Sequence, residues 1–219
     1  MKKCLRFFLP VCISVFLCGC AQIESYYNLS QPKGVSREYY ETLDRWSRSQ
    51  KVYSEFETRL YVTATLKSPE FRQAYHKEYS RLYALTEKEK ERRAGIHADL
   101  ASDSTEFYFY AYNPEKGNLD FSKADSVWKV FLVDDKGVRV PPLEVREIRK
   151  ITPLIEEFFP YVKSYGKFYT VKFPYSPALQ GLKLVFTSVL GNTILEWNGS
   201  SPGAGKAQSS ELQTSYLNS

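Results

Sequence analysis

The body of this 219-residue chain lacks cysteine. All four cysteines lie within the first 20 residues, at positions 4, 12, 18 and 20. If the segment before Cys20 is removed, one thiol remains, which excludes disulfide bonds in the body, cysteine zinc sites and a cysteine nucleophile in a pocket. Only two histidines occur, His76 and His97, and neither has a cysteine beside it. Because an imidazole metal site needs several converging ligands, the sequence predicts no metal and no cofactor.

The chain also lacks the short motifs of common hydrolases. It has no Gly-x-Ser-x-Gly and no His-Glu-x-x-His. The adjacent acids Glu156 and Glu157 point about 100° apart on a helix, so they cannot flank one bond. The sequence therefore predicts no catalytic residue and a protein that is not an enzyme. A hydrolase whose carboxylates converge from distant segments stays open as a weaker alternative.

A strong excess of one charge is absent as well. The net charge is +5, but Lys2, Lys3 and Arg6 stand in the first 19 residues with no acid among them. Without these three cations the net charge is +2. A nucleic-acid surface needs a clustered excess of Lys and Arg. Nucleic acid is therefore excluded as a predicted partner.

The first uncharged run is too short to cross a bilayer. Residues 7–19 carry no charge over 13 positions, whereas a membrane helix needs about 20 apolar residues. The run follows a cationic start and ends in Leu17-Cys18-Gly19-Cys20, the organisation of a secretory signal.

These four residues resemble the lipobox of bacterial prolipoproteins, in which leucine stands three positions before the modified cysteine. The resemblance implies that Leu17, Cys18 and Gly19 are recognised for cleavage and that Cys20 carries a diacylglycerol and, in many bacteria, an amide-linked acyl chain such as palmitate. At about 0.8 kcal/mol per buried methylene, such chains anchor a protein stably. In Gram-negative lipoproteins an aspartate directly after the modified cysteine favours retention in the inner membrane. Ala21 stands at this position here, so the resemblance favours the outer membrane. An ordinary cleaved signal peptide is the alternative, and the resemblance says nothing about the body.

Composition divides the chain into four parts. Residues 1–19 are the predicted lipoprotein signal peptide. Residues 20–35, which include Pro32 and Gly34, are mixed in character and suit a tether to the membrane. Residues 36–197 form one predicted domain, and residues 198–219, with nine Gly or Ser among 22 positions, are a predicted disordered tail.

Helix signals occur at three places. Ser36 caps a first helix with an apolar face, and Ser68-Pro69 begins a second helix. Thr86 and Glu89 form a capping box, after which the helix resumes and stops at Gly95. Thr152-Pro153 begins a short third helix. The signals at Ser68-Pro69 and at Thr86 together predict a helical insertion over about 68–95.

The remaining patterns predict strands. Apolar residues alternate over 52–66, which indicates one long strand with a wet side. Further strands are predicted at about 105–112, 126–134, 138–148 (broken by Pro141-Pro142), 167–173, 182–190 and 193–197. Gly191-Asn192 fits the turn of a hairpin. Seven short strands favour a mainly β fold, a β-sandwich with an immunoglobulin-like topology and a helical insertion. An α+β fold with helices on one face of an antiparallel sheet is the alternative.

Aromatic residues are the one compositional excess, with 17 tyrosines in the chain. Three tyrosines recur at helical spacing, and three others lie on one face of a predicted strand. Together they form a candidate aromatic binding surface: Tyr75, Tyr79, Tyr83, Tyr108, Tyr110 and Tyr112. Tyrosine offers a large area and a hydroxyl for stacking on sugars or on a partner. Spacing of four residues is also what core packing requires, so we favour packing of the helix stripe on the sheet.

These observations predict a non-catalytic lipoprotein of the bacterial cell envelope. It is expected to be anchored in a membrane through Cys20, outer rather than inner, and to act by binding another envelope protein. A module that binds glycans of the cell wall or a polysaccharide is the alternative.

Overall fold

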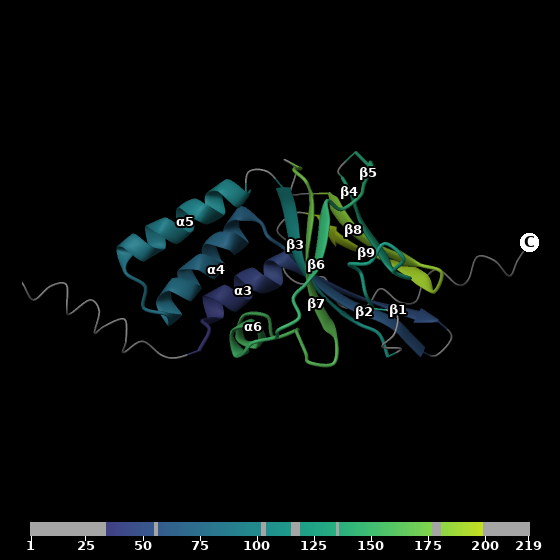
Figure 1. The fold of residues 1–219 in the computed structure, drawn as a ribbon, viewed down its shortest axis with the longest axis horizontal. Helices are drawn as coiled ribbons and strands as arrows, with labels where there is room; N and C mark the ends of the chain where they lie inside the picture. Colours follow the sequence, from purple (N-terminus) through teal and green to yellow (C-terminus); the bar gives the residue numbers. More distant parts are fainter. Residues whose placement is uncertain are drawn as a thin grey trace, which may run out of the picture.

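The computed structural model describes residues 34–54, 57–101, 104–114, 119–134, 136–176 and 181–198. Two antiparallel sheets pack face to face, and helices lie beside one of them (Figure 1). The larger sheet has the order β1-β2-β3-β7-β6, and the smaller has the order β5-β4-β8-β9. The fold is therefore mainly β, a β-sandwich with a helical insertion, as the sequence predicts. The immunoglobulin-like subdivision stays a prediction.

The strands of the larger sheet are β1 (Ser47–Ser54), β2 (Glu57–Leu66), β3 (Ser104–Tyr112), β7 (Lys167–Pro174) and β6 (Glu144–Glu147). Those of the smaller sheet are β5 (Arg139–Val140), β4 (Lys129–Val133), β8 (Leu182–Ser188) and β9 (Gly191–Trp197). Alternate residues of each strand point into the space between the sheets. That space is filled by side chains such as Leu60, Phe109, Trp128, Phe186 and Trp197.

The outer face of the larger sheet is also covered. Four helices follow the chain order α3 (Arg37–Trp46), α4 (Pro69–Leu82), α5 (Glu87–Ala101) and α6 (Pro153–Phe158). A second core joins Tyr39, Phe71 and Phe158 from three of these helices to Tyr110 and Phe168 of the sheet. The described residues thus form three layers: the smaller sheet, the larger sheet and the helices. Helices on one face of an antiparallel sheet, the feature of the alternative α+β fold, are therefore also present.

The helices begin at the residues that the sequence indicates. Phe71 donates its N–H to the Ser68 hydroxyl over 3.1 Å, and Tyr39 donates to the Ser36 hydroxyl over 3.3 Å. The Glu89 carboxylate accepts the N–H of Thr86 at 2.9 Å, which is one of the two bonds of the predicted capping box. Each bond satisfies a backbone N–H that has no partner within its own helix.

Two predicted boundaries are wrong. The single strand over 52–66 is a hairpin of β1 and β2, in which Val52 pairs with Leu60. Because both partners face the core, the alternation continues across the turn and imitates one long strand. The helical insertion therefore follows the second strand. The helix predicted to stop at Gly95 continues as α5 to Ala101, since Gly95 has no positive φ.

The last hairpin also differs in detail. Ser188 pairs with Gly191, so the turn is made by Val189 and Leu190 rather than by Gly191-Asn192. Gly191 has a φ of +134°, and a Cβ there would lie 2.7 Å from Cγ1 of Val52. Glycine is needed at this position because of this positive φ and because β1 passes closely over the hairpin, although Gly191 is not one of the two turn residues.

The two side edges of the sandwich differ. On one side β1 lies beside β9, where Trp197 donates its indole N–H to the Trp46 carbonyl over 2.9 Å and Arg48 donates to the Glu196 carbonyl over 3.0 Å. On the other side the edge strands are β6 and β5, and among the described residues no strand joins either from outside. One edge is closed and the other is open.

Candidate functional site

The residues predicted for lipid attachment and cleavage, Leu17, Cys18, Gly19 and Cys20, lie outside the described residues, as do residues 199–219 of the predicted tail. The described chain starts at Gly34, whose carbonyl accepts a hydrogen bond from Arg81 of α4. Two residues later, Ser36 donates its N–H to the Glu78 carboxylate over 2.7 Å. The start of the domain is therefore held on the helical layer. In the part of the chain described, no helix is both long and apolar enough to cross a membrane.

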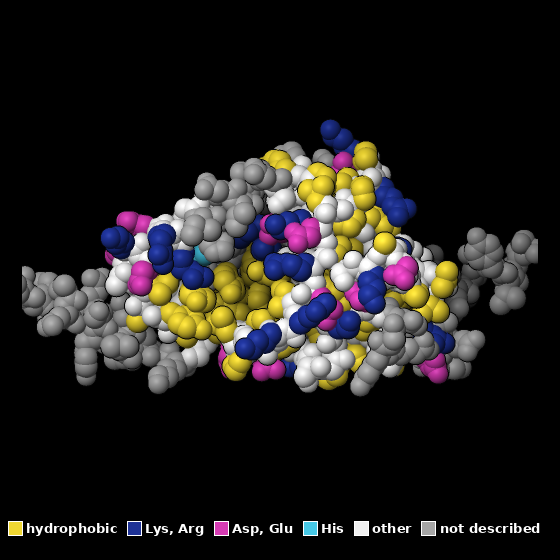
Figure 2. Space-filling view, viewed as in Figure 1, with side chains coloured by type: hydrophobic (Ala, Val, Ile, Leu, Met, Phe, Trp, Pro, Cys, Tyr) yellow, Lys and Arg dark blue, Asp and Glu magenta, His cyan; other side chains and the backbone are white. Residues whose placement is uncertain are grey.

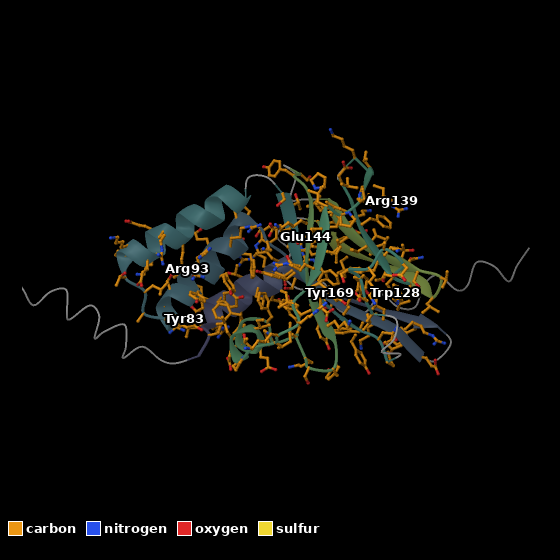
Figure 3. The ribbon with its side chains drawn as sticks, in the orientation of Figure 1. Tyr83, Arg93, Trp128, Arg139, Glu144 and Tyr169 are labelled. Atoms are coloured by element: carbon orange, nitrogen blue, oxygen red, sulfur yellow. The ribbon has the colours of Figure 1, made fainter. Side chains whose placement is uncertain are left out.

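The predicted helix tyrosines form a ladder of rings along α4. The ring centroids of Tyr75 and Tyr79 lie 6.3 Å apart, and those of Tyr79 and Tyr83 lie 4.4 Å apart, both stacked. The guanidinium carbon of Arg93, from α5, lies 4.1 Å from the centroid of Tyr79. Tyr83, at the end of the ladder, is 51% exposed (Figure 3). The ladder thus runs from the core to the surface.

The strand tyrosines lie on the outer face of the larger sheet, beneath the helical layer. Tyr110 is only 1% exposed, so its inclusion in a surface was wrong, because the chain around Gly166 passes directly over its ring. Tyr108 packs on Phe159, with ring centroids 5.1 Å apart, and Tyr112 packs on Tyr165 at 5.0 Å. Phe159 also stacks on Tyr75 at 6.2 Å. The structure joins the two predicted sets through a shared packing partner.

Apolar side chains gather in a hollowed patch over α4 and α6, bordered by Lys and Arg (Figure 2). Several half-buried apolar residues of the helical layer pack against the second core. They continue the second core and include Ala74, Tyr75, Leu82, Leu154 and Tyr161. Tyr83, the C-cap residue that follows α4, is strongly exposed.

A buried ion cluster lies beside this patch. The Glu106 carboxylate is buried and contacts the ammonium of Lys67, the guanidinium of Arg72 at 3.5 Å and the ammonium of Lys172 at 3.9 Å. Burial raises the pKa of Glu106, but the hydrogen bond and charge of Lys67 outweigh it, so the net pKa is lowered. A general acid needs a raised pKa. Glu106 is therefore suited to holding the sheet and α4 together rather than to proton donation.

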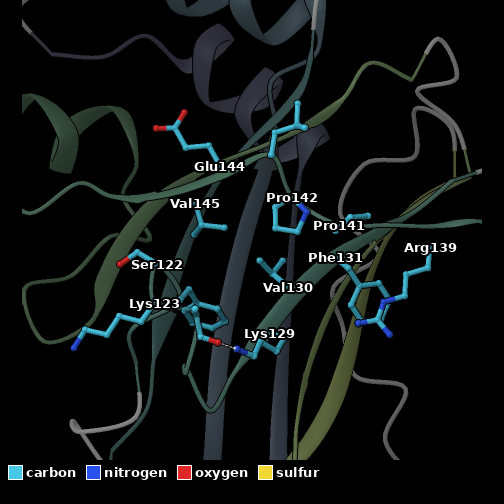
Figure 4. A pocket seen from close by; sticks show the side chains of 13 residues that line it. Ser122, Lys123, Lys129, Val130, Phe131, Arg139, Pro141, Pro142, Glu144 and Val145 are labelled. Atoms are coloured by element: carbon cyan, nitrogen blue, oxygen red, sulfur yellow. Dashed lines mark hydrogen bonds between the residues drawn. The ribbon is translucent and has the colours of Figure 1, made fainter.

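The open edge of the sandwich contains a cleft of about 530 Å³. Val130, Pro142 and Val145 meet at its centre (Figure 4), and Phe121 adds an aromatic side chain to the lining. The lining comes from β4, β5, β6 and the loops 121–124 and 141–143. Leu143, at the rim, is 67% exposed. The cleft is therefore an apolar recess between the two edge strands, open to solvent.

The charges around the cleft are mainly positive. The lining residues include Lys123, Lys129 and Arg139 and one acid, Glu144. Lys123 pairs with Asp120 at 3.4 Å, and Glu144 pairs with Lys172 at 3.7 Å. Lys129 donates to the carbonyl of Ala124, and the guanidinium carbon of Arg139 lies 3.9 Å from the ring centroid of Phe131. Within the described ranges neither Lys129 nor Arg139 forms an ion pair, so the cleft presents two cations without a carboxylate partner.

Sequence reasoning missed this cleft. Pro141 and Pro142 were interpreted only as a break in a strand, although a proline pair between two short strands is typical of an edge where the chain changes sheets. The lining residues are spread over some 25 positions and carry no motif. Among the residues described, no group of three or more His, Cys, Asp and Glu side chains could hold a metal ion.

Comparison of the chain with protein-family models, with curated proteins and with solved structures gave no match.

Proposed function

We propose that the chain is a lipid-anchored protein of the bacterial cell envelope that acts by binding another protein rather than by catalysis. The observation that carries the binding function is the difference between the two edges of the sandwich. One edge is closed by contacts between β1 and β9, whereas the other leaves β6 beside an apolar, cation-bordered cleft. Such an apolar recess with a polar rim can receive a few apolar side chains of a partner protein.

The anchor is supported by the resemblance at Leu17–Cys20. The side of the domain on which the described chain begins suggests how the domain would be oriented. Gly34 lies against α4 in the helical layer, while the cleft lies in the sandwich (Figure 1). A lipid attached upstream of Gly34 would place the helical layer toward the membrane. The cleft would then face away from the lipid, where it can reach a partner. Ala21 after the modified cysteine favours the outer membrane.

The anchor is tested by comparing the natural protein with Cys20→Ser in the same cells. We expect the mass of the natural amino-terminal peptide to show a diacylglycerol on Cys20 and the protein to enter the detergent phase. Cys20→Ser should stay in the aqueous phase at full length. An unmodified amino end in the natural protein would contradict the anchor.

The binding function is tested by photo-crosslinking in intact cells. A photoreactive amino acid at Leu143, 67% exposed at the rim of the cleft, is compared with one at Val189, which is 95% exposed at the turn between β8 and β9. Both positions are apolar and exposed, so they differ chiefly in location. A discrete adduct from position 143 that is absent from position 189 supports the proposal, and equal labelling from both contradicts it.

A glycan-binding module is the second candidate, and it depends on Tyr83. This ring is half-exposed and stacks on Tyr79 at 4.4 Å, which holds one aromatic face in place for a sugar. Retention of the protein on purified peptidoglycan or polysaccharide, lost in Tyr83→Ala, would favour this function. Retention that Tyr83→Ala does not change would remove the tyrosine ladder as its basis.

A further inference from the structure

The free edge of β6 presents unpaired backbone groups beside the cleft. Ile148 donates its N–H to the Phe168 carbonyl over 2.7 Å, in register with the pairing of Glu144 with Lys172 and Arg146 with Thr170. In an antiparallel pair, alternate residues bond to the neighbouring strand. Glu144 and Arg146 therefore bond toward β7, whereas Val145 and Glu147 direct their N–H and C=O groups away from the sheet. No strand among the described residues pairs with these four backbone groups, so they are available for another strand.

The edge carries little of the protection that natural sheets use. Edge strands are commonly blocked by proline, by inward-pointing charges or by a covering segment. The two prolines stand before β6, at positions 141 and 142, and leave its own N–H groups intact. Glu147 points inward, but the Lys167 ammonium lies 3.4 Å from its carboxylate and compensates its charge. Val145 packs on the sandwich core and holds the strand in place.

We propose that β6 receives an extended acidic segment of the partner protein as an added strand, with apolar side chains of that segment entering the cleft. This inference rests on the proposed binding function and names the chemistry of its ligand. Backbone hydrogen bonds to Val145 and Glu147 give the segment its direction. Lys129 and Arg139, which form no ion pair within the part of the chain described, select acidic side chains over basic ones.

Other occupants fit less well. A small organic anion could meet the two cations, but it would leave the outward groups of Val145 and Glu147 without partners. A second copy joined edge to edge through a two-fold axis would bring the cationic clefts of both copies together, with Lys129 and Arg139 of one near those of the other. Like charges across an interface are unfavourable. An acidic extended segment satisfies both the backbone and the charge.

The experiment measures binding of synthetic peptides to the full chain, purified in detergent. The probe is a fluorescent peptide of alternating glutamate and valine, compared with its lysine–valine counterpart. We expect saturable binding of the acidic peptide and at least about tenfold weaker binding of the basic one, because charge pairs at interfaces are worth this much. Two further acidic peptides carry N-methyl groups on alternate residues, in the two possible phases. One phase should lose binding and the other should keep it, since only one set of N–H groups faces β6.

Variants of the protein locate the site. The double variant Lys129→Glu/Arg139→Glu should weaken binding at least about tenfold, whereas Lys88→Glu on α5, a charge reversal in the helical layer, should leave it unchanged. Val145→Pro removes an N–H that points outward and leaves the bonds to β7, so it should abolish binding. If Val145→Pro does not fold, the paired N-methyl peptides still decide the question.

Equal binding of the acidic and basic peptides, or equal effects of the two N-methyl phases, would overturn the proposal. A dimer in sedimentation that Val145→Pro dissociates would also overturn it, because a second copy would then be the occupant. These results leave the proposed function standing if the adduct at Leu143 forms in cells. Loss of the adduct together with an unmodified Cys20 would instead remove the proposed function itself.

Discussion

The indole nitrogen of Trp197 in the last strand donates a hydrogen bond of 2.9 Å to the carbonyl of Trp46 at the end of the first described helix. This bond joins residues 151 positions apart and lies where the helical layer meets the closed edge of the sandwich. Arg48, two residues beyond Trp46, also lies over the Trp197 ring at 5.9 Å. The closed edge is therefore fixed by specific polar contacts in addition to apolar packing.

Replacement of Trp197 by phenylalanine should destabilise the domain more than the same change at Trp128. Both indoles are fully buried, so both substitutions remove similar volume. Trp128 has no hydrogen-bond partner for its indole N–H among the described residues, whereas Trp197 has one. We expect Trp197→Phe to cost about 1–2 kcal/mol more in the free energy of unfolding, measured with urea. Equal losses would show that the bond to Trp46 contributes nothing.

Gly191→Ala should destabilise the last hairpin strongly. The substitution places a Cβ at a φ of +134° and 2.7 Å from Val52, so it adds both backbone strain and a clash with β1. We expect a loss of about 2–4 kcal/mol in the free energy of unfolding. Gly137→Ala is the control, since Gly137 has a φ of +80° but no atom within 4 Å of a Cβ. A smaller loss at Gly137 isolates the close approach of β1, and an equal loss would exclude it.

Stability should fall at acid pH through Glu106. Its pKa in the folded protein is lowered from an ordinary value of 4.5. The ionised carboxylate therefore contributes its full stability above about pH 4.5, and this contribution is lost as the pH falls through the lowered pKa. Glu106→Gln should flatten part of the acid limb in urea unfolding measured between neutral pH and about pH 3.

The same variant should be less stable at neutral pH by about 3 kcal/mol, because Lys67 and Arg72 lose a buried carboxylate. Part of the acid dependence should remain, because the pKa values of Glu78, Glu89 and Asp120 are also lowered. An unchanged pH profile in Glu106→Gln would show that this carboxylate does not couple folding to protonation.

Ser68→Ala should cost about 1 kcal/mol in the free energy of unfolding, because the Ser68 hydroxyl accepts the N–H of Phe71 at the start of α4. Ser80→Ala, within the same helix, should be neutral or slightly stabilising, since alanine has the higher helix propensity. The pair separates a capping effect from the general effect of removing a hydroxyl. Chemical denaturation of both variants under one set of conditions decides between these outcomes.

Several features follow from short patterns. The starts of α3, α4, α5 and α6 were predicted from Ser36, Ser68, Thr86 and Thr152, because a capping side chain and the N–H groups it satisfies are neighbours in the chain. Most strands were found for a similar reason, since alternation is a local property. The division of residues 52–66 into β1 and β2 was missed because the hairpin preserves the alternation. A packing role for the helix tyrosines Tyr75, Tyr79 and Tyr83 was also predicted from their spacing.

The cleft could not be found in this way. Its lining joins β4, β5 and β6 with two loops. The number of residues between these segments does not determine how close they lie in space. The charge of Lys129 and Arg139 is visible in the sequence. That neither forms an ion pair with a described carboxylate follows only from the three-dimensional structure. Gly191 shows the same limit, because its close contact with Val52 comes from a strand far earlier in the chain.

By itself the amino-acid sequence determined the local structure, the mainly β class, the cysteine-free body and the resemblance of its first residues to a lipobox. Each of these depends on residue type and on spacing over a few positions. Only the tertiary structure decided which edge of the sandwich is closed, which tyrosines are buried and where a cleft remains. These depend on contacts between residues far apart in the chain, whose relative positions are set by the packing of the two sheets and the helical layer together.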